Sequence, residues 1–139
     1  MSKAFAFVAN NTSQTITGGG VVNPGVVQEG FGRYGCGCNC VRIIQLNGTN
    51  TNLRECGYYK IDVGATVSAT AAGNVTLSLY QDGALVAQGS ETIAVANDPA
   101  SISFPAGVKV NCNSVLTLVA TATAGDPIVT NVYTTVDKK

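Results

Sequence analysis

The chain has 139 residues, with eight basic side chains against eight acidic ones, so its formal net charge is zero and 12% of its residues are charged. That length suits one domain with a full hydrophobic core, and the balanced, dispersed charge excludes a nucleic-acid-binding protein. Histidine is absent, which excludes Ser-His-Asp and Cys-His catalysis and histidine metal sites.

The low charge itself is informative. Globular domains spend about a quarter of their residues on charged side chains, whereas this chain spends 12% and is 45% hydrophobic. A neutral, charge-poor surface favours association, so we expect a stable oligomer. No segment approaches the roughly 20 apolar residues of a membrane helix, and the N-terminal residues lack the features of a secretion signal. The sequence therefore predicts a soluble protein without a signal peptide.

Residues 1–35 form a glycine-rich N-terminal segment. Thr17–Gly20 and Asn23–Gly25 interrupt its short apolar pieces. We interpret the segment either as an attachment or bracing extension that lies on a neighbouring subunit or a larger assembly, or as edge strands of the same domain. Residues 36–139 are the predicted domain proper.

The cysteines form an unusual cluster. Cys36, Cys38 and Cys40 alternate, so in an extended chain all three thiols point to one face. The turn at 47–50 predicts a hairpin, and if Leu46 faces Thr51, Cys40 comes within disulfide reach of Cys56.

Three interpretations of this cluster stay open. The thiols are buried small hydrophobes, or Cys40 and Cys56 form one disulfide, or a metal ion is held by Cys36, Cys38, Cys40 and Cys56. The Cys-x-Cys-x-Cys spacing fits a zinc site poorly, and five cysteines leave at least one unpaired.

Strand patterns dominate the rest of the chain, and the whole sequence holds 40 β-branched residues. Gly57–Ala71 predicts one or two strands. Asn74–Tyr80 alternates apolar and polar residues, and Asp82-Gly83 then separates it from Ala84–Gln88. Asp-Gly between two such runs is a strong signal for a two-residue hairpin turn.

The C-terminal part repeats the pattern. Glu91–Ala96 and Ala100–Phe104 predict short strands broken at 97–99 and 105–107, and Val115–Thr123 with Ile128–Val136 predicts a second hairpin. Eight to ten strands at this spacing predict an all-β, two-sheet antiparallel sandwich or jelly roll.

From Gly57 onward the chain resembles the complement globular-head and tumour-necrosis-factor-like jelly-roll family. The resemblance rests on the Gly57-Tyr58-Tyr59-Lys60-Ile61-Asp62 segment, the strand and turn at 74–83, and the closing strands that end at 133–136. More narrowly, Tyr34-Gly35-Cys36 and the cysteine after 108–111 resemble short variants in bacteriophages and prophages of gut bacteria. The resemblance covers roughly residues 34–136.

This resemblance implies a ten-stranded sandwich that assembles as a homotrimer, with apolar and aromatic residues at the threefold axis. The calcium sites of the complement branch do not carry over, because the five Asp residues are scattered. The residues predicted to pack in the core or at the trimer axis are Tyr58, Tyr59, Leu79, Tyr80, Val119 and Tyr133. Among these, Leu79 and Val119 are taken as inward strand positions.

The predicted function is that of a non-enzymatic structural protein of a bacteriophage virion, a head fibre or capsid decoration protein displayed on the particle. Its loops at 81–83, 97–99 and 124–126 would face the exterior. The alternative is a tail-associated receptor-binding module that recognises host surface glycans. The expected partners are further copies of the chain, other virion proteins such as the capsid and, for the alternative, a glycan; no cofactor, nucleic acid or membrane is expected. The predicted localisation is the virion, assembled in the host cytoplasm.

Overall fold

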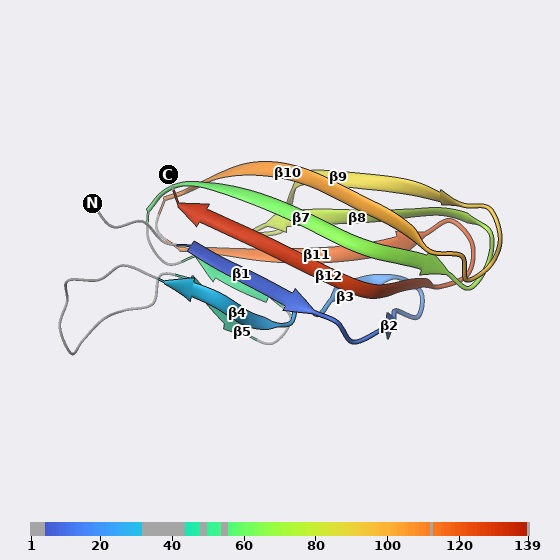
Figure 1. The fold of residues 1–139 in the computed structure, drawn as a ribbon. Helices are drawn as coiled ribbons and strands as arrows, with labels where there is room; N and C mark the ends of the chain where they lie inside the picture. Colours follow the sequence, from blue (N-terminus) through green and yellow to red (C-terminus); the bar gives the residue numbers. More distant parts are fainter. Residues whose placement is uncertain (1–4, 32–43, 48–49, 54–55, 112, 139) are drawn as a thin grey trace.

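The computed structural model describes residues 5–31, 44–47, 50–53, 56–111 and 113–138, which form two antiparallel sheets packed face to face (Figure 1). The strands of these residues are β1 (Phe5–Asn10), β2 (Gln14–Thr15), β3 (Gly20–Val22), β4 (Val26–Phe31), β5 (Ile44–Asn47), β6 (Asn50–Leu53), β7 (Gly57–Ala69), β8 (Gly73–Gln81), β9 (Ala84–Ile93), β10 (Ala100–Val110), β11 (Ser114–Ala122) and β12 (Pro127–Lys138). In the described part of the chain, no helix is long and apolar enough to cross a membrane.

The two sheets have six strands each. Sheet A has the order β10-β7-β12-β1-β4, with β2 paired to β12, and sheet B has the order β5-β6-β11-β8-β9, with β3 paired to β11. Strands that neighbour one another in a sheet are mostly distant in sequence, as in a jelly roll. The predicted fold class, an all-β, two-sheet antiparallel jelly-roll sandwich, is confirmed.

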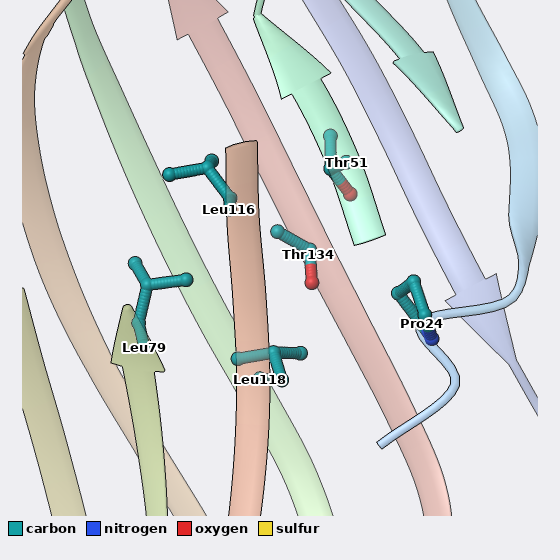
Figure 2. Close-up of a pocket in the computed structure, with 6 residues that line it drawn as sticks. All are labelled: Pro24, Thr51, Leu79, Leu116, Leu118 and Thr134. Atoms are coloured by element: carbon teal, nitrogen blue, oxygen red, sulfur yellow. The ribbon is translucent and has the colours of Figure 1, made fainter. Parts of the chain in front are cut away.

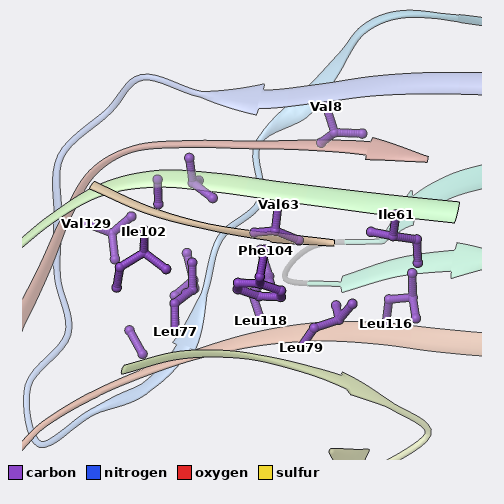
Figure 3. Packing of buried hydrophobic residues seen from close by; sticks show 14 of the residues in the cluster. Val8, Ile61, Val63, Leu77, Leu79, Ile102, Phe104, Leu116, Leu118 and Val129 are labelled. Carbon is purple, nitrogen blue, oxygen red and sulfur yellow. The ribbon is translucent and has the colours of Figure 1, made fainter. Parts of the chain in front are cut away.

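The core lies between the sheets and is built from one face of each strand. In β8, Val75, Leu77 and Leu79 are buried, and in β11 the inward residues are Leu116 and Leu118. Figure 3 shows the four leucines of this set facing side chains of sheet A such as Val63 and Phe104. Alternation of this kind is typical of a strand with two different faces. The side chains on the inner face are removed from water, which stabilises the fold.

The β8–β9 hairpin is confirmed where it was predicted. Asp82 and Gly83 form its turn with φ values of 51° and 88°, the positive values that a type I′ turn needs at both positions. The turn is also tied to the start of β11. The Asp82 N–H donates to the Val115 carbonyl oxygen, and Asp82 Oδ1 accepts from the Val115 N–H, each at 2.9 Å.

The β5–β6 hairpin is confirmed as well, including its register, because Leu46 pairs with Thr51. The turn residues 48–49 and Cys40 lie outside the described residues.

The predicted second hairpin is wrong. Both of its segments are strands, but β11 pairs with β3, β6 and β8 in sheet B, whereas β12 pairs with β1, β2 and β7 in sheet A. The connection at 123–126 therefore crosses from one sheet to the other. An alternating pattern predicts a strand, but it does not determine which other strand it pairs with.

The predicted break at 105–107 is also wrong, since β10 continues through it to Val110. Pro105 pairs with Asp62 of β7, and β10 is the last strand of sheet A. Proline has no backbone N–H, so in an inner strand it would remove one hydrogen bond of the sheet. An edge strand tolerates proline, because one of its sides needs no such hydrogen bond.

Residues 5–31 contribute β1–β4 to the two sheets, with β1 between β12 and β4 in sheet A and β3 beside β11 in sheet B. Of the two interpretations of residues 1–35, this part of the segment has the geometry of added strands.

The sandwich has two distinct ends. The start of β1 pairs with the end of β12, Phe5 opposite Asp137; we call this the terminal end. The connections at 70–72, 94–99 and 123–126 gather at the opposite, distal end (Figure 1). The turn at 82–83 lies at the terminal end, beside the start of β11. The three loops expected to face the exterior thus divide between the two ends.

Candidate functional site

Aromatic side chains gather on the outer face of sheet A. Alternation along β7 buries Tyr59 and leaves Tyr58 61% exposed, and alternation along β12 buries Thr134 and leaves Tyr133 41% exposed. Both exposed rings point away from the core on the same sheet. We call the surface formed by Phe7, Tyr58, Gly64, Lys109 and Tyr133 the tyrosine face.

The Tyr133 ring packs into a space on this surface that a glycine of β7 leaves open. Its cross-strand partner on β7 is Gly64, and a Cβ at Gly64 would overlap the outer part of the Tyr133 ring. The glycine therefore lets the ring lie flat against the strand. On the other side, the ring of Phe7 on β1 is tilted by 41° with its centroid 6.3 Å from that of Tyr133, a favourable aromatic pair geometry.

Tyr58 lies nearer the terminal end of the same face. It is opposite Lys109 of β10, whose Nζ is 5.8 Å from the ring centroid. At this exposure a cation–π contact contributes about 0.5–1 kcal/mol. The outer face of sheet A therefore presents aromatic surface from Tyr58, Tyr133 and the half-buried Phe7.

Among the described side chains, the charged residues of this face lie towards its terminal end. Lys60, Asp62 and Asp137 occupy outward positions towards the terminal end, whereas the row of Tyr133 contains Ser103, Gly64 and Ala9. The centre of the face is therefore uncharged, which lowers the desolvation cost of covering it.

The structure separates the residues predicted for the core or the trimer axis. Tyr59 and Leu79 are buried between the sheets, and Tyr58 and Tyr133 lie on the tyrosine face. Tyr80 and Val119 are half-buried on the outer face of sheet B. Val119 pairs with Ser78, while Leu79 pairs with the buried Leu118. Leu79 and Val119 therefore lie on opposite faces of sheet B, and their placement at a trimer axis stays a prediction.

Phe7 and Gly64 were not singled out from the sequence. The alternation of Phe5 and Phe7 in the segment 5–10 was a usable signal for an aromatic strand face. Gly64 had no such signal, because its role depends on a neighbour 69 positions away in sequence.

The cysteine cluster lies largely beyond what the structure describes. Cys56 is exposed, and its Sγ contacts the carbonyl oxygen of Asn111. Cys36, Cys38 and Cys40 are outside the described residues, so the disulfide between Cys40 and Cys56 and the four-cysteine metal site stay predictions. Within the described residues, no three His, Cys, Asp or Glu side chains are grouped so that they could hold a metal ion.

A small internal cavity lies between the sheets. Its volume is about 10 Å³, roughly the space of one water molecule. Figure 2 shows its lining, where Pro24 lies near Leu118 and Thr134 while Leu79 closes the other side. The hydroxyl of Thr134 is buried here and has no hydrogen-bond partner among the described residues. A space of this size holds no organic substrate.

The strand order and layering are those of the jelly roll found in tumour-necrosis-factor-like and complement C1q-like structures. Murine APRIL matches with a TM-score of 0.71 at 9% identity, covering 99% of this chain and all of the other. Eiger TNF from S. frugiperda matches at 0.69 and 13% identity, covering 99% of this chain and 91% of the other.

The globular domain of zebrafish complement 1qA protein matches at 0.64 and 12% identity, covering 96% of this chain and 95% of the other. No protein-family model matches the sequence, and no curated protein matches it. At these identities the likeness shows the shared fold alone.

Proposed function

We propose that this chain functions by assembly and display rather than by catalysis, as a homotrimeric structural protein of a bacteriophage virion, a head fibre or capsid decoration protein. The observation that carries the assembly part is the tyrosine face, where Tyr58 and Tyr133 are 61% and 41% exposed. The few residues that carry most of the binding energy of protein interfaces are enriched in large aromatic side chains. Exposing such side chains to water does not stabilise an isolated chain.

The distribution of polar and apolar residues on the face supports its burial between chains. The face lies on the outer side of sheet A, its uncharged centre surrounds Tyr133, and charged residues lie towards one end. An apolar centre with a polar rim is the usual anatomy of a protein interface. The trimer and the virion come from the sequence resemblance, and the proposal joins them to this surface.

The alternative stays a second candidate: a tail-associated receptor-binding module that recognises host surface glycans. A specific observation favours it, because an uncharged cleft lined by amide side chains opens at the end of β1. Assembly and glycan binding are compatible in one protein.

Self-association is tested by sedimentation equilibrium of the purified chain, with three chain masses as the expected result. Replacing Tyr58 and Tyr133 by serine together is expected to shift the population towards monomer. The matched control replaces Val21 and Leu85, which are 45% and 51% exposed on sheet B, by serine; its mass distribution should stay that of the wild type. A folded wild-type monomer at micromolar concentration would refute the assembly proposal.

The virion role has a separate test. Phage particles produced by the host are purified on a density gradient, and their proteins are digested and analysed by mass spectrometry. Peptides of this chain should appear in the particle fraction at a stoichiometry in multiples of three. Their absence from intact particles would overturn the virion assignment while leaving the assembly result in place.

A further inference from the structure

A polar cleft lies beside the end of β1, and Ala9, the cross-strand neighbour of Tyr133, forms part of its lining. Its volume is about 480 Å³, within the range of small-molecule sites. The residues that line it are Ala9, Asn10, Asn11, Thr12, Gln14, Asn23 and Gly25. Five of the seven carry side chains that hydrogen-bond and none is charged, so the cleft differs from an ordinary solvated loop.

The walls of the cleft are held by a dense set of hydrogen bonds. Gln14 binds the backbone of Asn23 in both directions, with Nε2 donating to the carbonyl oxygen at 2.9 Å and Oε1 accepting from the N–H at 2.8 Å. Asn10 Nδ2 donates to the same carbonyl oxygen at 3.1 Å. Asn10 Oδ1 also accepts from the N–H of Thr12 at 2.9 Å. Two amide side chains therefore fix three segments of the chain relative to one another.

The turn at 23–25 is anchored from both sides. Pro24 is buried and lines the internal cavity with Leu118 and Thr134 (Figure 2). Gly25 has a φ of 96°, and a Cβ there would overlap the carbonyl group of Ala9. The Gly25 N–H donates to Asn23 Oδ1 at 2.9 Å. The cleft is thus rigid before any ligand arrives, which reduces the entropy cost of binding.

Hydrogen-bonding capacity is left over inside this rigid frame. Within the part of the chain that the structure describes, the Asn11 carboxamide, the Thr12 hydroxyl and Asn23 Nδ2 make no hydrogen bond. Each carboxamide presents a donor and an acceptor side by side. Neighbouring hydroxyls of a sugar ring match this arrangement, because each hydroxyl both donates and accepts.

The same inventory argues against other ligands. Without a charged side chain in the cleft, a phosphate or carboxylate gains no ionic partner. A peptide strand needs free backbone N–H groups at a sheet edge, whereas the N–H groups of Thr12, Asn23 and Gly25 already donate to side-chain oxygens.

We propose that this cleft, which we call the amide cleft, binds a neutral saccharide unit through Asn11, Thr12 and Asn23. The proposal rests on the second candidate function, to which it assigns a site.

The test is a titration of the full, ¹⁵N-labelled chain followed by NMR of backbone and side-chain amides. The probes are methyl α-D-mannopyranoside, methyl β-D-galactopyranoside, N-acetyl-D-glucosamine and maltotriose, each up to about 100 mM, with acetyl-trialanine amide as the peptide probe. At least one sugar should give saturable shifts confined to residues 9–14 and 23–25, in the millimolar range typical of a single ring that makes a few hydrogen bonds.

The variant Asn11→Ala should weaken that binding about threefold to tenfold, the effect of losing one or two net hydrogen bonds. Its melting temperature should stay unchanged, because the Asn11 side chain makes no hydrogen bond to the described residues. Asn131→Ala, at an exposed position of β12, is the matched control and should bind like the wild type. The proposal is overturned if no sugar produces saturable shifts, if the peptide binds the cleft instead, or if Asn131→Ala and Asn11→Ala behave alike.

Discussion

At the scale of single residues, the pair of Gly64 and Tyr133 shows how one side chain depends on the absence of another. The Tyr133 ring occupies the space that a Cβ at Gly64 would need. A methyl group there forces the ring off the strand, where it loses its packing on β7 and its contact with Phe7. The two positions should therefore behave as one energetic unit.

We predict that Gly64→Ala lowers the free energy of unfolding by about 1–3 kcal/mol, the usual cost of overpacking. Urea unfolding followed by tyrosine fluorescence measures it, since the chain has no tryptophan. In a Tyr133→Ser background the same change should cost much less. Gly107→Ala is the control, because a Cβ at this position of β10 meets nothing within 4 Å. Equal losses at Gly64 and Gly107 would contradict the pairing.

Thr134 offers a second prediction at this scale. Its hydroxyl is buried in the small internal cavity, where no described residue forms a hydrogen bond with it, and an unsatisfied buried polar group costs about 1–3 kcal/mol. Thr134→Val keeps the shape and removes that cost, so we expect the free energy of unfolding to rise by about 1 kcal/mol. Thr135→Val, at the neighbouring half-buried position on the opposite face, should change it little. A loss of stability in Thr134→Val would mean that the hydroxyl is satisfied after all.

At the scale of elements, Asp82 does more than close the β8–β9 hairpin. It adopts a positive φ of 51° and exchanges two hydrogen bonds with Val115 of β11. The turn is thereby joined to β11, the strand with which β8 pairs along its length.

We predict that Asp82→Ala lowers the free energy of unfolding by about 1–2 kcal/mol, because alanine disfavours the left-handed conformation and lacks the oxygen that accepts from Val115. Asp82→Asn retains both properties and should lose less than about 0.5 kcal/mol. Equilibrium unfolding in urea separates the two variants. If they lost the same stability, the charge of Asp82 rather than its hydrogen bond would be responsible.

Comparison of the elements explains which parts of the fold were predictable. The hairpins β5–β6 and β8–β9 were predicted because their turns and partners lie within a few residues of each other in sequence. The local sequence of the connection from β11 to β12 looks like that of another hairpin. Its two strands are separated because they belong to different sheets. Pro105 was taken as a break because the edge position of β10 is a property of the assembled sheet.

The candidate surface was predictable to the same extent. Alternation requires Tyr58 and Tyr59 to face opposite sides, but it does not say which side is the core. The same ambiguity applies to Leu79 and Val119, which lie on opposite faces of sheet B. Nothing local marks Gly64, and the amide cleft combines residues from three segments whose proximity depends on β1 and β3 lying in different sheets.

At the scale of the whole molecule, the scarcity of charge has a definite place in the structure. One face of each strand is buried between the sheets, and the centre of the tyrosine face around Tyr133 is uncharged. If that face is covered in the native assembly, the free energy of unfolding includes the burial of aromatic area between chains. Stability then depends on how many chains are available to associate.

This dependence gives the last prediction. When folded trimers dissociate into unfolded chains, a tenfold rise in total chain concentration stabilises each chain by two-thirds of RT ln 10, about 0.9 kcal/mol. For a domain of this size, the melting temperature should rise by about 3–5 °C. Differential scanning calorimetry at two concentrations a factor of ten apart measures the shift. The Tyr58→Ser, Tyr133→Ser double variant should melt lower and show little dependence on concentration, because its chains no longer share that aromatic area. A wild-type melting temperature that stays constant across the concentration range would mean that each chain is stable alone, and the exposed tyrosines would then need another partner.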